Sequence, residues 1–160
     1  MKAESLKPYL KEMMTCTLCG FCKGVCPSFA EMGWDPASAR GRMLLSYGLL
    51  QKEIEPDFSV INALYQCTTC NDCQRKCPSK IKVVEVVESA RKDLVSSNCG
   101  LEPHRKIAEN IRKAGNPFGE KKELSERARK AEIGYFAGCL ARYRMPEIAE
   151  ASLSILKKLG

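Results

Sequence analysis

The sequence predicts a mainly α-helical fold, and three observations lead to this prediction. A cysteine-rich phrase occurs twice, and the residues that separate the copies, 27–66, carry apolar side chains at helical spacing. Apolar stripes of the same period recur over 81–113 and over 145–159. One short segment, 133–137, has instead the β-branched and aromatic content that is typical of a strand.

Both copies of the cysteine-rich phrase have the form C-x2-C-x2-C-x3-C-P. Together they contain eight of the ten cysteines: Cys16, Cys19, Cys22 and Cys26 in the first copy, and Cys67, Cys70, Cys73 and Cys77 in the second. Bacterial ferredoxins bind [4Fe-4S] clusters through thiolates at this spacing. Three closely spaced cysteines on a compact loop can reach three corners of one cluster. The sequence therefore predicts two [4Fe-4S] clusters.

The fourth cysteine of each copy precedes a proline, and in two-cluster ferredoxins this cysteine ligates the other cluster. We therefore predict crossed ligation, in which each cluster takes three cysteines from one copy and the fourth from the other. The first cluster is predicted to be held by Cys16, Cys19, Cys22 and Cys77, and the second by Cys67, Cys70, Cys73 and Cys26. No catalytic residue is predicted.

Structural zinc is the main alternative, and it would make the chain a zinc-stabilised interaction module. Zinc takes four ligands and usually pairs two CxxC units, often with histidine. Each run here has four cysteines followed by proline, and the chain has a single histidine, so clusters are favoured. Disulfides are disfavoured because we see no secretory signal, and such runs in an intracellular protein indicate metal or redox chemistry.

The charge and hydropathy of the chain exclude two classes of partner. The formal net charge is +7 with neutral cysteines. Two oxidised clusters with their thiolates contribute about −4, which leaves roughly +3, too little to indicate nucleic-acid binding. The longest uncharged apolar stretch, 43–51, is far shorter than a membrane span, so no transmembrane segment is expected.

The first helices are predicted on either side of the first cysteine run. Residues 3–14 are expected to form a short amphipathic helix that leads into Cys16. A second helix is expected over 37–52, with Asp35 as its cap and Pro36 in its first turn, where proline is tolerated. The apolar stripe of this second helix consists of Met43, Leu44, Tyr47 and Leu50.

Further helices are predicted around and after the second run. Residues 58–65 carry an apolar stripe that ends just before Cys67. Residues 81–97 contain a valine-rich run with strand propensity, but Val84, Val87 and Arg91 continue at helical spacing, so we predict a helix. Another helix is expected over 102–113. Because the spacer between the cysteine runs is long and helical, the predicted module is an all-helical two-cluster ferredoxin domain.

The last part of the chain changes character. Residues 115–131 are rich in charge and are expected to form a solvated linker. The strand expected at 133–137 and the helix expected at 145–159 make half of a βαβ unit, which cannot bury both faces alone. We therefore expect a chain that is truncated or that completes its fold with another polypeptide.

Five segments now carry a resemblance: the two cysteine runs, the spacer sequence at 38–43 (SARGRM), and the sequences at 115–119 (GNPFG) and 135–143 (YFAGCLARY). With them the chain resembles the iron–sulfur subunits of the heterodisulfide reductase and glycolate or lactate oxidase group. The resemblance implies a ferredoxin domain over 1–114, a charged linker over 115–131 and a partial cysteine-rich CCG domain over 132–160. No Cys-Cys-Gly sequence is present, so no CCG active site is complete in this chain.

The resemblance implies a component of an oxidoreductase that relays single electrons through its clusters. The donor would be a flavoprotein or a ferredoxin, and the acceptor a quinone or a disulfide. The alternative is the N-terminal part of a heterodisulfide-reductase-type catalytic subunit whose active site lies in further CCG domains. The implied partners are a flavoprotein dehydrogenase or reductase subunit, a ferredoxin, or a quinone-linked membrane subunit. The implied location is cytoplasmic, or peripheral at the cytoplasmic membrane face.

The remaining chemically interesting residues have two interpretations each. Cys139 resembles the first cysteine of a CCG domain but is expected to be unliganded here. Cys99 is expected to be a structural thiol, and His104 a surface residue. Arg40 and Arg42 either lie near a cluster, where their charge would raise its potential, or form a solvated face.

Overall fold

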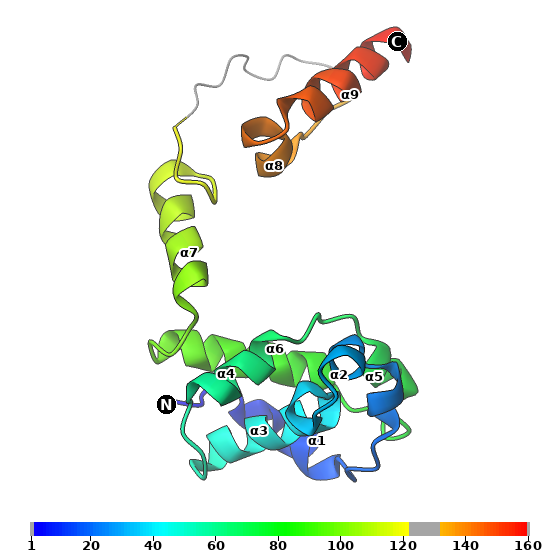
Figure 1. Ribbon diagram of the computed structural model, residues 1–160, viewed down its shortest axis with the longest axis vertical. Helices are drawn as coiled ribbons and strands as arrows, with labels where there is room; N and C mark the ends of the chain where they lie inside the picture. Colours follow the sequence, from blue (N-terminus) through cyan, green and yellow to red (C-terminus); the bar gives the residue numbers. More distant parts are fainter. Residues whose placement is uncertain (1, 122–131, 160) are drawn as a thin grey trace. The chain divides into compact units, whose positions relative to one another are not determined.

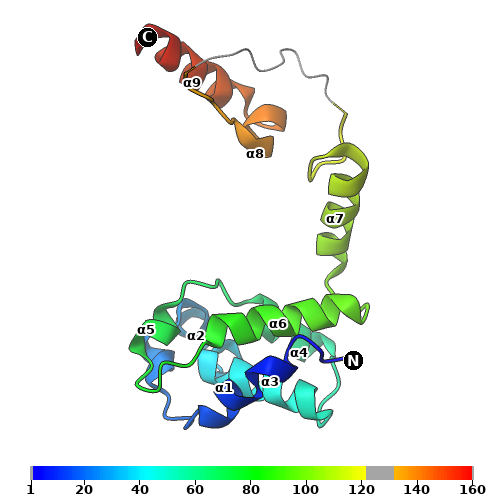
Figure 2. The ribbon, with the colours of Figure 1, turned by 180° about the vertical axis from the view of Figure 1, so that it is seen from behind.

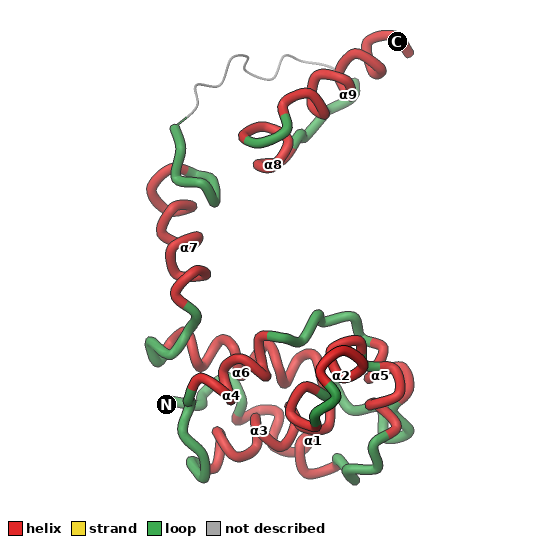
Figure 3. The backbone as a smooth tube through the Cα atoms, in the orientation of Figure 1, coloured by secondary structure: helices red, strands yellow, loops and turns green. Residues whose placement is uncertain are grey.

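The computed structural model describes residues 2–121 and 132–159, and every regular element within those ranges is a helix (Figure 3). The mainly α-helical prediction is therefore confirmed. The chain divides into two compact units, Met1–Leu101 and Glu102–Gly160. The predicted domain boundaries remain predictions, and residues 122–131 of the predicted linker lie outside the described residues. None of the described helices is long and apolar enough to cross a membrane.

The N-terminal unit is a bundle of short and medium-length helices. In chain order these are η1 (Lys7–Tyr9), α1 (Leu10–Thr15), η2 (Phe21–Val25), α2 (Pro27–Met32), η3 (Asp35–Ala37), α3 (Ala39–Gln51), α4 (Phe58–Tyr65), α5 (Asp72–Lys76) and α6 (Val83–Ser96). The long helix α6 lies across α3 and α4 (Figures 1 and 2). The short helices η2 and α5, each of which follows a cysteine loop, pack against each other.

Most of the predicted helices are present, and their ends follow from local chemistry. The valine-rich segment is helical, as predicted, because its apolar residues face α3 and α4 rather than a neighbouring strand. The Asp57 carboxylate caps α4 by accepting a hydrogen bond from the N–H of Val60 at 2.9 Å. The helix expected over 3–14 is shorter than predicted, because Pro8 confines its start to the 3-10 helix η1 and α1 begins only at Leu10.

The predicted start and apolar stripe of α3 need correction. Its cap is Ser38, whose hydroxyl accepts a hydrogen bond from Gly41 N–H at 3.0 Å, and Asp35 opens the separate helix η3 instead. Leu44 is 47% exposed, whereas Leu49 is 2% exposed. The buried face of α3 includes Arg42 and Ser46, and two polar residues on a buried face obscure the apolar pattern.

Gly41 allows α3 to lie directly against η3. A Cβ atom at this position would lie 2.1 Å from the carbonyl oxygen of Asp35 and 2.7 Å from the Cα of Pro36. Only glycine permits backbones to approach this closely. The contact fixes the first turn of α3, and with it Arg40 and Arg42, beside the segment that follows the first cysteine run.

The C-terminal unit contains α7 (Glu102–Ala114), α8 (Gly138–Tyr143) and α9 (Pro146–Leu159). The helices expected over 102–113 and 145–159 are present. The strand expected at 133–137 is not formed: the described residues 132–137 have no regular structure. A strand needs a neighbour to pair its N–H and C=O groups, and no described residues of this chain supply one.

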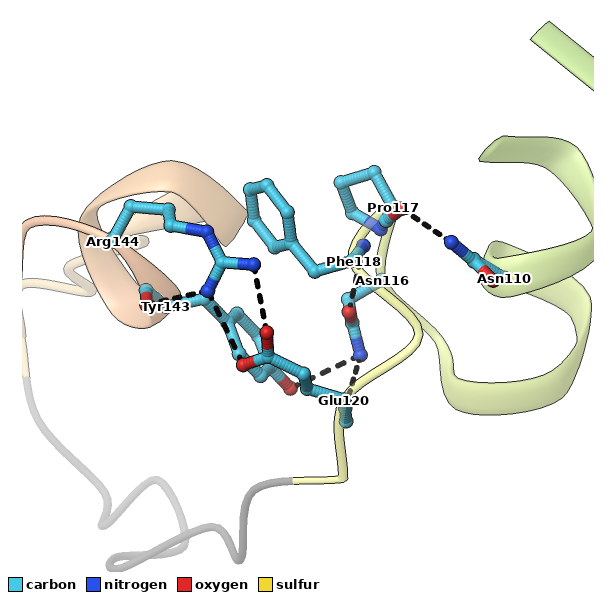
Figure 4. A network of polar contacts seen from close by, with 7 residues as sticks. All are labelled: Asn110, Asn116, Pro117, Phe118, Glu120, Tyr143 and Arg144. Carbon is cyan, nitrogen blue, oxygen red and sulfur yellow. Dashed lines mark hydrogen bonds and ion pairs between the residues drawn. The ribbon is translucent and has the colours of Figure 1, made fainter. Parts of the chain in front are cut away.

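A buried asparagine organises the turn that follows α7 (Figure 4). The Asn116 side chain is 1% exposed. Its amide nitrogen donates to the carbonyls of Ala114 at 2.9 Å and Glu120 at 2.6 Å and to the Tyr143 hydroxyl at 3.3 Å, and its oxygen accepts from Phe118 N–H at 3.0 Å. Asn116 thus joins the turn to α8, and an ion pair between Glu120 and Arg144 at 2.7 Å supports the same contact.

We expect Gly41→Ala to destabilise the N-terminal unit by about 1–3 kcal/mol or more, since the added Cβ overlaps the backbone of η3. Thermal unfolding of the anaerobically purified protein measures this. Gly24→Ala is the matched control, because a Cβ at Gly24 meets no atom within 4 Å. Equal unfolding temperatures for the two variants would contradict the close approach.

We expect Asn116→Ala to loosen the turn by about 1–3 kcal/mol, because it leaves buried backbone groups without partners. Amide hydrogen exchange of Phe118 and the neighbouring residues measures the local opening. Asn110→Ala is the control, since the Asn110 amide makes a single hydrogen bond, to Pro117 O at 2.9 Å. The larger increase in exchange should follow Asn116→Ala.

Candidate metal centre

The two cysteine loops repeat their backbone conformation as well as their sequence. Leu18 and Thr69 occupy equivalent positions and have φ angles of 56° and 55°. Gly20 and Asn71, two residues later, have φ angles of 83° and 65°, and each precedes a short helix. A positive φ at leucine or β-branched threonine is strained, and such strain persists mainly at functional sites. The repeated strain marks both loops as built for binding.

The first loop surrounds a cavity together with the end of the second. The cavity is lined by all four cysteines of the first predicted ligand set, Cys16, Cys19, Cys22 and Cys77. Cys73 lines it as well, and Pro78 and Ile81 close it on the side of the second loop. The structure thus places Cys77 beside a loop that lies far from it in the sequence.

The second predicted set is placed less completely. Cys67 and Cys70 lie on the second loop, and Cys73, in the first turn of α5, is buried. Cys26 is also buried and is not among the described residues that line the first cavity. The Ser28 hydroxyl donates a hydrogen bond to the carbonyl of Gln66 at 2.7 Å, so the segment that follows Cys26 lies beside the start of the second loop.

The surroundings of the thiols affect their ionisation in opposite directions. A hydrogen bond from the N–H of Phe21 lowers the pKa of the exposed Cys19 thiol. Burial raises the pKa of Cys22, although the N–H of Arg40, in the first turn of α3, donates to its sulfur and offsets part of this effect. Burial raises the pKa of Cys73 to about 12. Because thiolates rather than thiols ligate metals, metal binding must release the protons of Cys22 and Cys73.

Two arginines cap the C-terminal end of α4, which leads into Cys67. The Nε of Arg42 donates to the carbonyl of Ala63 at 2.7 Å, and Arg91 donates to the carbonyls of Leu64 at 2.8 Å and Cys67 at 2.6 Å. The last carbonyls of a helix have no partners within the helix, and cationic side chains satisfy them well. Arg42 and Arg91 therefore position the second loop from α3 and α6.

The donor set and its surroundings fit an anionic, thiolate-bound cluster. Arg42 is 1% exposed, its Nη1 lies 3.8 Å from the Cys26 sulfur, and its Nη2 is buried without a hydrogen-bond partner. A buried cation with an unused donor beside a sulfur is suited to an anion at that position.

The described residues offer no compact site for a single metal ion. Within residues 2–121 and 132–159, no three cysteine, histidine, aspartate or glutamate side chains lie close enough to hold a single metal ion. Thiolates that share one tetrahedral zinc lie about 3.8 Å apart, because each Zn–S bond is about 2.3 Å long. A [4Fe-4S] cluster binds each thiolate to a different iron atom, so its four thiolate sulfurs lie farther apart than those of a zinc site.

The motif region matches a known family. Residues 12–81, which include all eight motif cysteines, match the 4Fe-4S dicluster domain. The match covers 70 of the 160 residues and spans both cysteine loops.

Curated relatives place the dicluster domain in a larger group. A component of the dihydromethanophenazine:CoB–CoM heterodisulfide reductase of Methanosarcina acetivorans is 34% identical over 177 residues, which cover 94% of this chain and 43% of the relative. The probable glycolate oxidase iron–sulfur subunit of Bacillus subtilis is 38% identical over 88 residues, 54% of this chain and 20% of the relative. A component of the H(2):CoB-CoM heterodisulfide,ferredoxin reductase of Methanothermobacter thermautotrophicus is 29% identical over 145 residues, 91% and 74% of the two chains.

These relatives confirm the group predicted from the sequence. The chain carries the sequence of a 4Fe-4S dicluster domain and is similar over 94% of its length to a heterodisulfide reductase component. It spans less than half of the length of the Methanosarcina relatives, 43% in each case.

The sequence left open the roles of two arginines on α3 and missed the role of a third on α6. Arg40 and Arg42 are two positions apart on α3, so their side chains point about 200° apart and only Arg42 is buried. Arg91 lies at a position of the apolar stripe of α6. Its hydrogen bond to the end of α4 was not predicted from the sequence. An arginine within such a stripe is the signal that it reaches a buried acceptor.

Cys99, Cys139 and His104 are not among the described residues that line the cavity. Cys99 packs against the hydrophobic core of the N-terminal unit, as expected for a structural thiol. Cys139 is half-buried at the start of α8, and His104 is exposed on α7. Both belong to the C-terminal unit.

Proposed function

We propose that this chain holds two [4Fe-4S] clusters by crossed ligation and relays single electrons between a flavoprotein or ferredoxin donor and a quinone or disulfide acceptor. Cys16, Cys19, Cys22 and Cys77 would hold one cluster, and Cys67, Cys70, Cys73 and Cys26 the other. The observation that carries the proposal is the cavity that collects Cys77 with the three cysteines of the first loop. When bound, such clusters supply reversible one-electron transfer.

The residues of the chain perform the binding and the positioning. The backbone N–H groups of Phe21 and Arg40 donate to the sulfurs of Cys19 and Cys22, and such hydrogen bonds favour the thiolate forms that ligate iron. Pro78 and Ile81 contribute apolar surface to the lining of the cavity. Burial, hydrogen bonds to sulfur and nearby charge are the means by which a protein sets cluster potentials.

The names of the relatives support the class of partner. One relative is named as a reductase of a heterodisulfide and a ferredoxin, and another as the iron–sulfur subunit of a probable glycolate oxidase. We extend these chemistries to this chain as the proposed donor and acceptor classes, with a flavoprotein subunit, a ferredoxin or a quinone-linked membrane subunit as the partner. A cytoplasmic position, or one at the cytoplasmic membrane face, follows from the same proposal.

A second candidate is the N-terminal part of a catalytic subunit whose active site lies in further CCG domains. It is favoured by the alignment with the Methanosarcina acetivorans relative, which covers 94% of this chain but 43% of the relative. The mass of the native polypeptide, measured after isolation of its complex, distinguishes the two. A polypeptide as long as that relative supports the catalytic role, and one of 160 residues supports the relay.

Metal analysis tests the proposal directly. We expect the anaerobically purified chain to contain about eight irons and eight acid-labile sulfides, because each of the two clusters has four of each. Reduction should give the EPR spectrum of two interacting clusters. Two zinc ions without sulfide would overturn the redox proposal and leave a zinc-stabilised interaction module.

Crossed ligation has its own test. Cys77→Ser should remove or alter the cluster that is held by Cys16, Cys19 and Cys22, and leave the other in place. Mössbauer and EPR spectra, combined with Cys19→Ser as a second variant of the same set, identify the cluster that changes. Cys139→Ser is the matched control and should keep both clusters. Loss of the cluster held by Cys67, Cys70 and Cys73 in the Cys77→Ser protein would show uncrossed ligation.

A further inference from the structure

Arg42 is a buried cation whose contacts are all uncharged. It is 1% exposed, and its hydrogen-bond partners are the carbonyl of Ala63 and, at 3.8 Å, the sulfur of Cys26. Its Nη2 atom is buried and has no partner among the described residues. Capping α4 uses only the Nε group, so the role of a helix cap does not account for the rest of the guanidinium.

A second arginine lies near the same ligand set in similar surroundings. Arg91 donates to the carbonyls of Leu64 and Cys67, and its guanidinium lies 5.3 Å from the centre of the Tyr65 ring. Within the described part of the chain, no carboxylate accepts a hydrogen bond from Arg42 or Arg91. Both charges therefore act on their surroundings without local neutralisation.

The cations beside the first ligand set differ in this respect. Arg40 and Lys23 both pair with Asp35, at 2.7 Å and 2.9 Å. Their side chains are 28% and 27% exposed, so water and salt screen them further. Arg40 also reaches the carbonyl of Leu18 at 3.3 Å, which places this neutralised group at the first loop.

We propose that Arg42 raises the reduction potential of the cluster held by Cys26, Cys67, Cys70 and Cys73 above that of the cluster held by Cys16, Cys19, Cys22 and Cys77. Reduction adds one negative charge, and a fixed cation in a buried, weakly polarisable environment stabilises that charge more than a screened, paired cation does. Arg91 also raises the potential of this cluster, but by less than Arg42 does, because Arg91 is more exposed to solvent. The inference rests on the proposed two-cluster function and adds an order of potentials to it.

The test is an anaerobic redox titration of the full chain, followed by EPR. Arg42→Gln removes the charge and keeps a hydrogen-bond donor, whereas Arg42→Lys keeps the charge. We expect Arg42→Gln to lower the upper of the two potentials and leave the lower one unchanged, and Arg42→Lys to keep most of the difference. Arg40→Gln is the matched control, and it should shift either potential less, because it leaves the Lys23–Asp35 pair in place.

Iron content and circular dichroism of each variant separate a change of potential from a loss of structure. An Arg42→Gln protein with both clusters and an unchanged upper potential would overturn the inference, as would a shift of the lower potential alone. If Arg42→Gln fails to retain the second cluster, the Cys77→Ala protein provides the deciding measurement. The ligand set beside Arg42 is the only complete one that this variant keeps.

The complete cluster of the Cys77→Ala protein should titrate at the upper wild-type potential. Titration at the lower wild-type potential would contradict the inference. Failure of the underlying function looks different: the wild-type chain would then lack iron and sulfide altogether, and no potential would be measured.

Discussion

The N-terminal unit depends on one constraint, which is that two cysteine loops far apart in the sequence must face each other. Two polar contacts join the surroundings of the two loops, and a third joins the second loop to the helix that follows it. The Ser28 hydroxyl donates to Gln66 O at 2.7 Å, Gln74 Oε1 accepts from Val84 N–H at 2.6 Å, and Glu12 Oε2 accepts from Lys82 N–H at 3.1 Å. Each contact joins a segment beside one loop to a segment beside the other or to the helix that follows it. The packing of η2 against α5 completes the arrangement.

The helices around the loops serve to hold this arrangement. The buried side chains Leu64, Val87 and Leu94 join α4 to α6, and Met43 and Leu49 add the face of α3. Burial of an aliphatic side chain of this size contributes about 1.5–3 kcal/mol. The end of α4 is in turn fixed by arginines from α3 and α6, so the second loop is tied to two helices at once. Because polar and apolar contacts converge on the same helix end, the position of Cys67 is strongly determined.

The helical class and the ends of the longer helices could be predicted from the sequence, because both depend on the local spacing of apolar, capping and proline residues. The sequence did not predict that Leu44 is exposed and Leu49 buried, since the buried face of α3 carries Arg42 and Ser46. It also expected a strand at 133–137 from propensity alone, and propensity cannot supply the neighbour that a strand requires. The sequence indicated that Arg40 and Arg42 could lie near a cluster, but only three-dimensional packing distinguishes the half-buried Arg40, which pairs with Asp35, from the buried Arg42, which has no carboxylate partner among the described residues.

The position of Cys77 in the first cavity has a consequence for the order of events during biosynthesis. The cavity is lined by Cys16, Cys19 and Cys22 together with a residue from the far end of the second run. A ribosome that has made only the first run has therefore made only three of these four cysteines. The complete cavity can form only after residue 77 has left the exit tunnel, so a cluster that needs all four of these cysteines would be assembled only once both runs are exposed.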